Sequence, residues 1–112
     1  MRRITAVLFV FLCVVLVGCG ESAAQKEARI RVNIQSMSES AVRNRLKDPA
    51  SAQFQNQLVS SKGAACGEVN SKNGFGGYTG FKRYIFAGKD LTVFESDMAP
   101  GEFEVSWGQV CN

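Results

Sequence analysis

The chain has 112 residues, of which 46% are hydrophobic, 10% aromatic and 21% charged, and it contains four cysteines but no histidine. This length allows one domain at most. Without His, a Ser-His-Asp or Cys-His active site is excluded, and the commonest metal ligand is missing. The composition, with only two prolines, is not that of a disordered or collagen-like chain.

The N-terminus has the layout of a secretory signal. Residues 1–3 (Met-Arg-Arg) form a basic start, residues 4–17 form an apolar run interrupted only by Thr5, and the small residue Gly18 follows. This run is shorter than the roughly 20 residues of a membrane-spanning helix. The pattern therefore favours a cleaved signal peptide over residues 1–18 rather than a permanent transmembrane anchor.

The end of the apolar run, Leu16-Val17-Gly18-Cys19, resembles the lipobox of bacterial lipoprotein precursors. The resemblance implies that the signal is cut before Cys19, that its thiol carries diacylglycerol, and that the new amino group is usually acylated. Two or three acyl chains anchor a protein stably. Because Gly20 is not Asp, the same resemblance implies the outer membrane in a Gram-negative host. The alternative is an ordinary signal peptide with an accidental cysteine.

The remaining cysteines predict a disulfide. Cys13 leaves with the signal and Cys19 takes the lipid, so Cys66 and Cys111 remain as a pair in an oxidising compartment. Closing this loop would stabilise the fold by about 4 kcal/mol. A redox dithiol is disfavoured because it expects C-x-x-C spacing, and two thiols without His make a poor metal site. We expect no metal and no cofactor besides the covalent lipid.

The charge of the mature chain is nearly balanced. Loss of Arg2 and Arg3 lowers the net charge from +3 to +1. A basic footprint for nucleic acid is therefore absent, and we expect no nucleic-acid partner. The lipid alone is expected to supply the affinity for the membrane.

The first part of the mature chain predicts a helix. After a lipidated tether over residues 19–25, a single domain is expected over residues 26–112. Residues 24–47 carry good helix formers and an apolar stripe, although Ile30, Val32 and Ile34 also alternate as a strand would. A capping box at residues 36–39 allows the helix to restart there. Asp48 is expected to cap a short turn that begins at Pro49.

The rest of the chain predicts an antiparallel sheet. Turn-forming residues separate candidate strands over residues 54–59, 65–71, 78–87, 91–96 and 103–110. Their short connections leave no room for crossover helices. We therefore expect an α+β fold in which the N-terminal helix packs on a sheet of about four to five strands.

Two stretches resemble a pattern in small bacterial and prophage-associated proteins. Residues 46–54 read LKDP-x-SA-x-F, and residues 66–81 read CG-x-VN-x-KN followed by GGY-x-GF. The resemblance implies a shared domain and carries over no activity.

The glycine-rich stretch inside this pattern predicts an aromatic loop. Phe75, Gly76, Gly77 and Tyr78 are expected to form a turn that presents its aromatic side chains to a protein partner. A phosphate-binding loop, with Lys72, Lys82 and Arg83 nearby, is disfavoured because no helix follows the glycines and GK[ST] is missing.

The sequence favours binding over catalysis. Paired carboxylates are the remaining route to hydrolysis, but their spacing is ordinary for solvated charges; the acidic residues in question are Glu68, Asp90, Glu95, Asp97, Glu102 and Glu104. We therefore expect a non-enzymatic, lipid-anchored envelope module that binds an envelope protein. The alternatives are a prophage-type surface lipoprotein that blocks a receptor or a superinfecting phage, and a small envelope enzyme or enzyme inhibitor.

Overall fold

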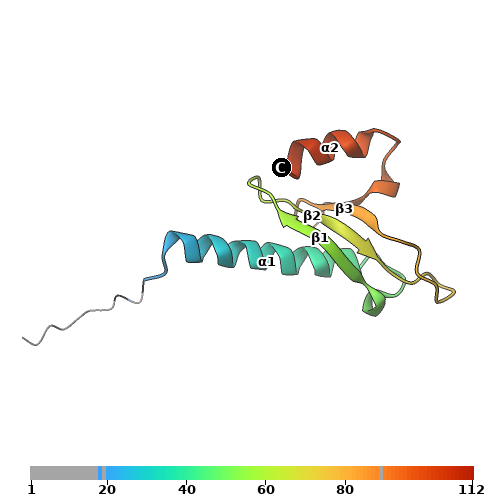
Figure 1. Cartoon of the computed structure of the whole chain (residues 1–112), viewed down its shortest axis with the longest axis horizontal. Coiled ribbons are helices and arrows are strands. Elements are labelled where there is room, and N and C mark those ends of the chain that lie inside the picture. The colour runs from blue at the N-terminus through green and yellow to red at the C-terminus, as the bar shows by residue number, and fades with distance from the viewer. Residues whose placement is uncertain (1–17, 19, 89) are drawn as a thin grey trace, which may run out of the picture.

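The computed structural model describes Gly18 and residues 20–88 and 90–112. The predicted signal over residues 1–17 and the predicted lipidation site Cys19 lie outside the described residues. The described chain forms three layers, with helix α1 on one face of a four-stranded sheet and helix α2 on the other (Figure 1). The expected α+β class, with a helix packed on an antiparallel sheet, is confirmed. No helix in this part of the chain is long and apolar enough to span a membrane.

Helix α1 is one uninterrupted helix, Ala23–Arg43. Its capping box lies at Ser22, whose Oγ accepts from the backbone N–H of Gln25 at 3.2 Å while the Ser22 N–H donates to Gln25 Oε1 at 2.9 Å. The restart that the sequence allowed at residue 36 does not occur: the helix continues through Ser38, which is buried and whose hydroxyl donates to the Gln35 carbonyl at 2.7 Å. The helix ends four residues before the predicted Lys47 and begins inside the predicted tether.

The first half of α1 extends beyond the sheet (Figure 1). Every residue from 23 to 33 is exposed, whereas Ser38 and Val42 are completely buried. An ion pair at i,i+4 spacing between Glu27 and Arg31, 2.9 Å long, supports this projecting half together with the capping box. Its stability therefore depends on local interactions more than on packing.

The sheet is an antiparallel meander in the order β1-β2-β3-β4. A short 3-10 turn, Pro49–Ser51, precedes it where predicted, although the Asp48 side chain does not cap that turn. Four of the five predicted strands are present, and the last two are shorter than predicted: β1 Gln53–Val59, β2 Ala65–Asn70, β3 Lys82–Phe86 and β4 Thr92–Phe94.

The fifth predicted strand, residues 103–110, is wrong: these residues form helix α2, Glu102–Val110. Gly101, at φ 89°, turns the chain into the helix, and Glu102 and Glu104 lie favourably in its first turn. Phe103 is buried, while Val105, which would share its face if these residues formed a strand, is 60% exposed. The apolar side chains follow the helical period and not the strand period.

The core has two parts, one on each face of the sheet. Between α1 and the sheet lie Val42, Val69, Tyr84 and Phe94; between α2 and the sheet lie Ala64, Cys66, Ile85, Phe103 and Cys111. Adjacent residues of the central strand β3, Tyr84 and Ile85, thus serve opposite faces. Both residues lie within the predicted strand 78–87, whereas Tyr78 and Phe81 of that range lie outside β3 and are partly exposed.

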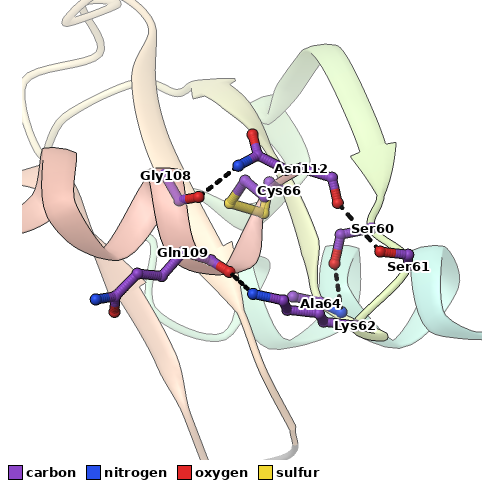
Figure 2. Close-up of a disulfide and its surroundings, with 9 residues drawn as sticks. Ser60, Ser61, Lys62, Ala64, Cys66, Gly108, Gln109 and Asn112 are labelled. Carbon is purple, nitrogen blue, oxygen red and sulfur yellow. Dashed lines mark hydrogen bonds between the residues drawn. A yellow bond between two sulfur atoms is a disulfide. The ribbon is translucent and has the colours of Figure 1, made fainter.

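The predicted disulfide between Cys66 and Cys111 is confirmed, with both residues buried (Figure 2). It joins β2 to the end of α2. Lys62 Nζ donates to the Gln109 carbonyl, and the Ser61 hydroxyl donates to the Asn112 carbonyl at 3.4 Å. The β1–β2 turn and the disulfide together hold the C-terminus on the sheet.

Candidate functional site

The β2–β3 connection forms a closed loop at one end of the domain. An isolated bridge pairs Lys72 with Tyr78, and the Asn73 N–H donates to the Gly77 carbonyl at 2.8 Å. The Gly76 N–H donates to the Asn73 carbonyl at 3.1 Å, and Gly76 adopts a φ of 82° that favours glycine. The four predicted loop residues, Phe75 to Tyr78, therefore belong to one tight turn.

The side chain of Asn73 organises the tip of this loop. Its Oδ1 accepts hydrogen bonds from the backbone N–H groups of Phe75, at 2.9 Å, and Gly77, at 3.2 Å. Both donors are thereby occupied inside the loop. The glycine-rich backbone consequently does not offer these amides to an anion, in keeping with the disfavoured phosphate-loop interpretation.

The two aromatic residues of the loop differ in their roles. Phe75 is 99% exposed, whereas Tyr78 is 46% exposed, and its hydroxyl donates to the Ser51 carbonyl at 3.2 Å. Lys72 Nζ lies 5.6 Å from the centroid of the Tyr78 ring. Tyr78 thus braces the loop against the domain, and Phe75 projects from it into solvent.

The loop lies at the end of the molecule opposite the start of α1 (Figure 1). In that view α1 runs away from the N-terminal segment beneath the sheet, and the β2–β3 connection protrudes beyond the far end of the sheet. A surface that binds Phe75 would therefore approach the domain from the side remote from Ala23.

A cavity of about 240 Å³ adjoins the foot of the loop. Lys72 and Lys82, noted in the sequence as neighbours of the glycines, both line it, whereas Arg83 points to the other face of the sheet. Lys47 also lines the cavity, although no motif in the sequence singled it out. Lys47 follows α1 and is distant in sequence from the loop, so no local pattern could have placed it there.

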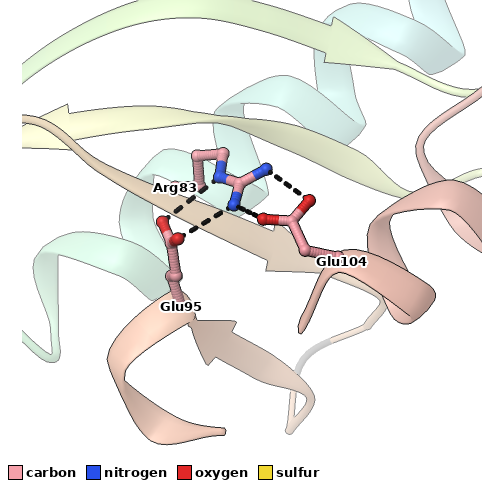
Figure 3. Close-up of polar contacts among 3 residues, drawn as sticks. All are labelled: Arg83, Glu95 and Glu104. Carbon is pink, nitrogen blue, oxygen red and sulfur yellow. Dashed lines mark hydrogen bonds and ion pairs between the residues drawn. The ribbon is translucent and has the colours of Figure 1, made fainter. Parts of the chain in front are cut away.

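Two of the carboxylates considered for hydrolysis converge on Arg83 (Figure 3). Arg83 Nη2 lies 2.9 Å from Glu95 Oε1, and Arg83 Nη1 lies 3.1 Å from Glu104 Oε2. Hydrogen bonds from Arg83 lower the pKa of both glutamates. A glycosidase acid needs a raised pKa, which neither glutamate has. Instead, Glu104 joins β3 to α2, and Glu95 joins β3 to the 3-10 turn Glu95–Asp97 that follows β4.

The Arg83 guanidinium also stacks on aromatic rings of α2. It lies 5.1 Å from the centroid of Phe103 and 5.4 Å from that of Trp107.

Within the described part of the chain, no group of three or more His, Cys, Asp or Glu side chains is arranged to hold a metal ion. Comparisons with protein-family models, with curated proteins and with solved structures found no match for this chain.

Proposed function

We propose that this protein is a lipid-anchored envelope lipoprotein whose domain binds a protein partner through the Phe75 loop. The observation that carries the binding role is the exposed ring of Phe75 on a turn held by Asn73. Aromatic side chains dominate the energetics of many protein interfaces, and a preorganised loop loses little entropy on binding. A fully exposed aromatic ring on a backbone held by hydrogen bonds meets both conditions.

The anchoring role is supported by the lipobox-like sequence and by the arrangement of α1. With lipid on Cys19, only three residues would separate the anchor from Ala23. A helix with the 21 residues of α1 is about 32 Å long. The projecting half of α1 would then act as a spacer between membrane and sheet, with the Phe75 loop at the remote end.

The binding role is tested by crosslinking in the native envelope. A photoreactive phenylalanine analogue replaces Phe75 in one variant and Val105 in a control variant, since Val105 is an exposed apolar residue on α2. We expect a discrete adduct from position 75 and none from position 105. Equal adducts from both positions, or none from position 75, would contradict the proposal. Identification of the crosslinked protein by mass spectrometry distinguishes an envelope assembly protein from a phage receptor.

The anchor is tested separately with Cys19→Ala. We expect the wild-type protein to carry lipid and to fractionate with the membrane, and the variant to lose both properties. Membrane association that persists in the variant, together with a wild type that carries no lipid, would contradict the anchoring role. Cys66→Ala with Cys111→Ala serves as the control, because it removes two other cysteines and should leave lipidation intact.

A further inference from the structure

The cavity beside the Phe75 loop is surrounded by positive charge. Its walls come from the turn after α1, from the end of β2, from the foot of the loop and from β3. Among the described residues, no Asp or Glu lines the cavity. Four cationic residues line it: Arg45, Lys47, Lys72 and Lys82. Such a concentration of one charge in a concave site attracts anions.

Three of these four charges are uncompensated. Arg45 binds Asp97 with two hydrogen bonds of 2.6 and 3.1 Å, which neutralise its charge. Among the described residues, Lys47, Lys72 and Lys82 form no ion pair. Three lysine side chains that line one small cavity carry like charges, and a bound anion with more than one negative charge would offset them.

The other lining residues suit the rest of such a ligand. The hydroxyl groups of Ser71 and Ser96 form no hydrogen bond among the described residues and are available to oxyanion oxygens, whereas the Thr79 hydroxyl donates to the Ser71 carbonyl at 3.5 Å. Leu46, Val69 and Phe94 add apolar lining. Lysine binds phosphate as a compact point charge, and a phosphate monoester carries close to two negative charges at neutral pH. A single carboxylate, with one negative charge, would leave most of the positive charge of the three lysines uncompensated.

We propose that this cavity binds a phosphate monoester group attached to a small apolar body. This inference deepens the proposed function and rests on it for the biological setting, because Lys72, Asn73 and Thr79 belong both to the cavity and to the foot of the loop. A phosphorylated ligand would lie beside the surface that Phe75 presents. Binding of the phosphate group itself is independent of Phe75 and is measured without the partner.

The test is a titration of the purified full-length, ¹⁵N-labelled protein in a non-ionic detergent, followed by NMR. The probe is phenyl phosphate, and phenyl sulfate, which has the same ring and one charge fewer, is the matched control. We expect saturable shifts of the Ser71, Thr79 and Ser96 amide signals, with phenyl sulfate binding at least about tenfold more weakly. The absence of saturable shifts, or equal affinity for the two probes, would overturn the proposal.

Charge variants distinguish a specific binding site from nonspecific electrostatic attraction. Lys72→Gln with Lys82→Gln is expected to weaken phenyl phosphate binding by at least about tenfold. Lys26→Gln, a change of a remote exposed lysine on α1, should leave it unchanged. An equal effect of Lys26→Gln would overturn the proposal. Binding of a glutamate-rich peptide more tightly than phenyl phosphate would also overturn it and would assign the cavity to an acidic protein segment.

Two further measurements identify the source of the phosphate and keep this inference distinct from the proposed function. If a lipid carries the phosphate group, short-chain phosphatidic acid is expected to shift the same amide signals, and short-chain phosphatidylcholine is the control. Shifts with phenyl phosphate alone would instead assign a soluble ligand. Either result supports the site. Phe75→Ala removes the proposed partner-binding ring and should leave phenyl phosphate affinity unchanged, whereas a missing adduct from the photoreactive analogue at position 75 would contradict the proposed function alone. Loss of that affinity in Phe75→Ala would overturn the inference.

Discussion

Asn73 fixes the backbone of Phe75: its side-chain oxygen accepts the Phe75 N–H at 2.9 Å, and the Phe75 ring two residues further along is 99% exposed. The same oxygen also accepts the N–H of Gly77. One short polar side chain therefore determines the conformation from which the aromatic ring projects. Such a loop needs little reorganisation on binding, which favours affinity.

Asn73→Ala is expected to loosen the loop while leaving the domain folded. Removal of the acceptor returns the N–H groups of Phe75 and Gly77 to water, so the free energy of unfolding should fall by less than about 1 kcal/mol. Amide hydrogen exchange at these two residues should become faster, and the Phe75 crosslink should weaken. Asn73→Asp keeps the acceptor and should preserve both. Unchanged exchange rates in Asn73→Ala would show that the side chain does not hold the loop.

Loss of the disulfide between Cys66 and Cys111 is expected to destabilise the domain strongly. The cysteines are 45 residues apart, and a crosslink that closes a loop of this length contributes about 4 kcal/mol. Urea unfolding of the oxidised and reduced wild-type protein measures this difference without a substitution. Fluorescence of Trp107, the single tryptophan, should shift to the red on reduction as α2 loosens. Coincident unfolding curves would contradict the prediction.

Arg83→Gln is expected to reduce the acid sensitivity of the fold. Arg83 lowers the folded-state pKa of Glu95 and Glu104 below the unfolded values. The two carboxylates therefore stabilise the fold above the unfolded pKa, and this contribution is lost as the pH falls through the folded pKa. Urea midpoints measured from about pH 7 to about pH 2 should fall less steeply in Arg83→Gln than in the wild type.

A second arginine provides the control for that experiment. Arg45 lowers the pKa of Asp97 by hydrogen bonding. Arg45→Gln should reduce the contribution of Asp97, which keeps the hydrogen bond from the Phe94 N–H, and leave that of Glu95 and Glu104 in place. Parallel curves of urea midpoint against pH for the wild type and Arg83→Gln would contradict the prediction. They would mean that the ion pairs of Arg83 contribute nothing to the pH dependence of stability.

Gly67→Ala is expected to destabilise the α1 side of the core. A Cβ at this position would lie 2.8 Å from the hydroxyl oxygen of Tyr84, which is completely buried and cannot move freely. Overpacking of this kind costs about 1–3 kcal/mol. Gly74→Ala, where the added atom meets open space, is the matched control. Thermal or urea unfolding measures both changes.

The cost of Gly67→Ala should be smaller in a Tyr84→Phe background. The substitution removes the atom nearest to the new Cβ, although the ring carbon at 3.1 Å remains. A double-mutant cycle should therefore show a coupling between positions 67 and 84. Strictly additive effects would mean that the chain relieves the contact by another route.

Local patterns in the sequence were sufficient for much of the fold. Good helix formers predicted α1, and turn residues between short apolar runs predicted five antiparallel strands, of which four are present. Cysteine arithmetic predicted the pairing of Cys66 with Cys111. The glycines around Phe75 predicted a turn that presents an aromatic ring. In each case the signal lies within a few neighbouring residues or in a small number of possible pairs.

The class of the fold, the antiparallel arrangement of its strands and the disulfide could thus be predicted from local patterns and cysteine pairing, as could a turn that presents Phe75. Only the tertiary structure decided that residues 102–110 form a helix, because Phe103 and Trp107 fit either period and packing against Ile85 and the disulfide selects the helical one. It likewise brought Lys47 beside Lys72 and Lys82. These outcomes depend on contacts between distant segments, which no local pattern encodes.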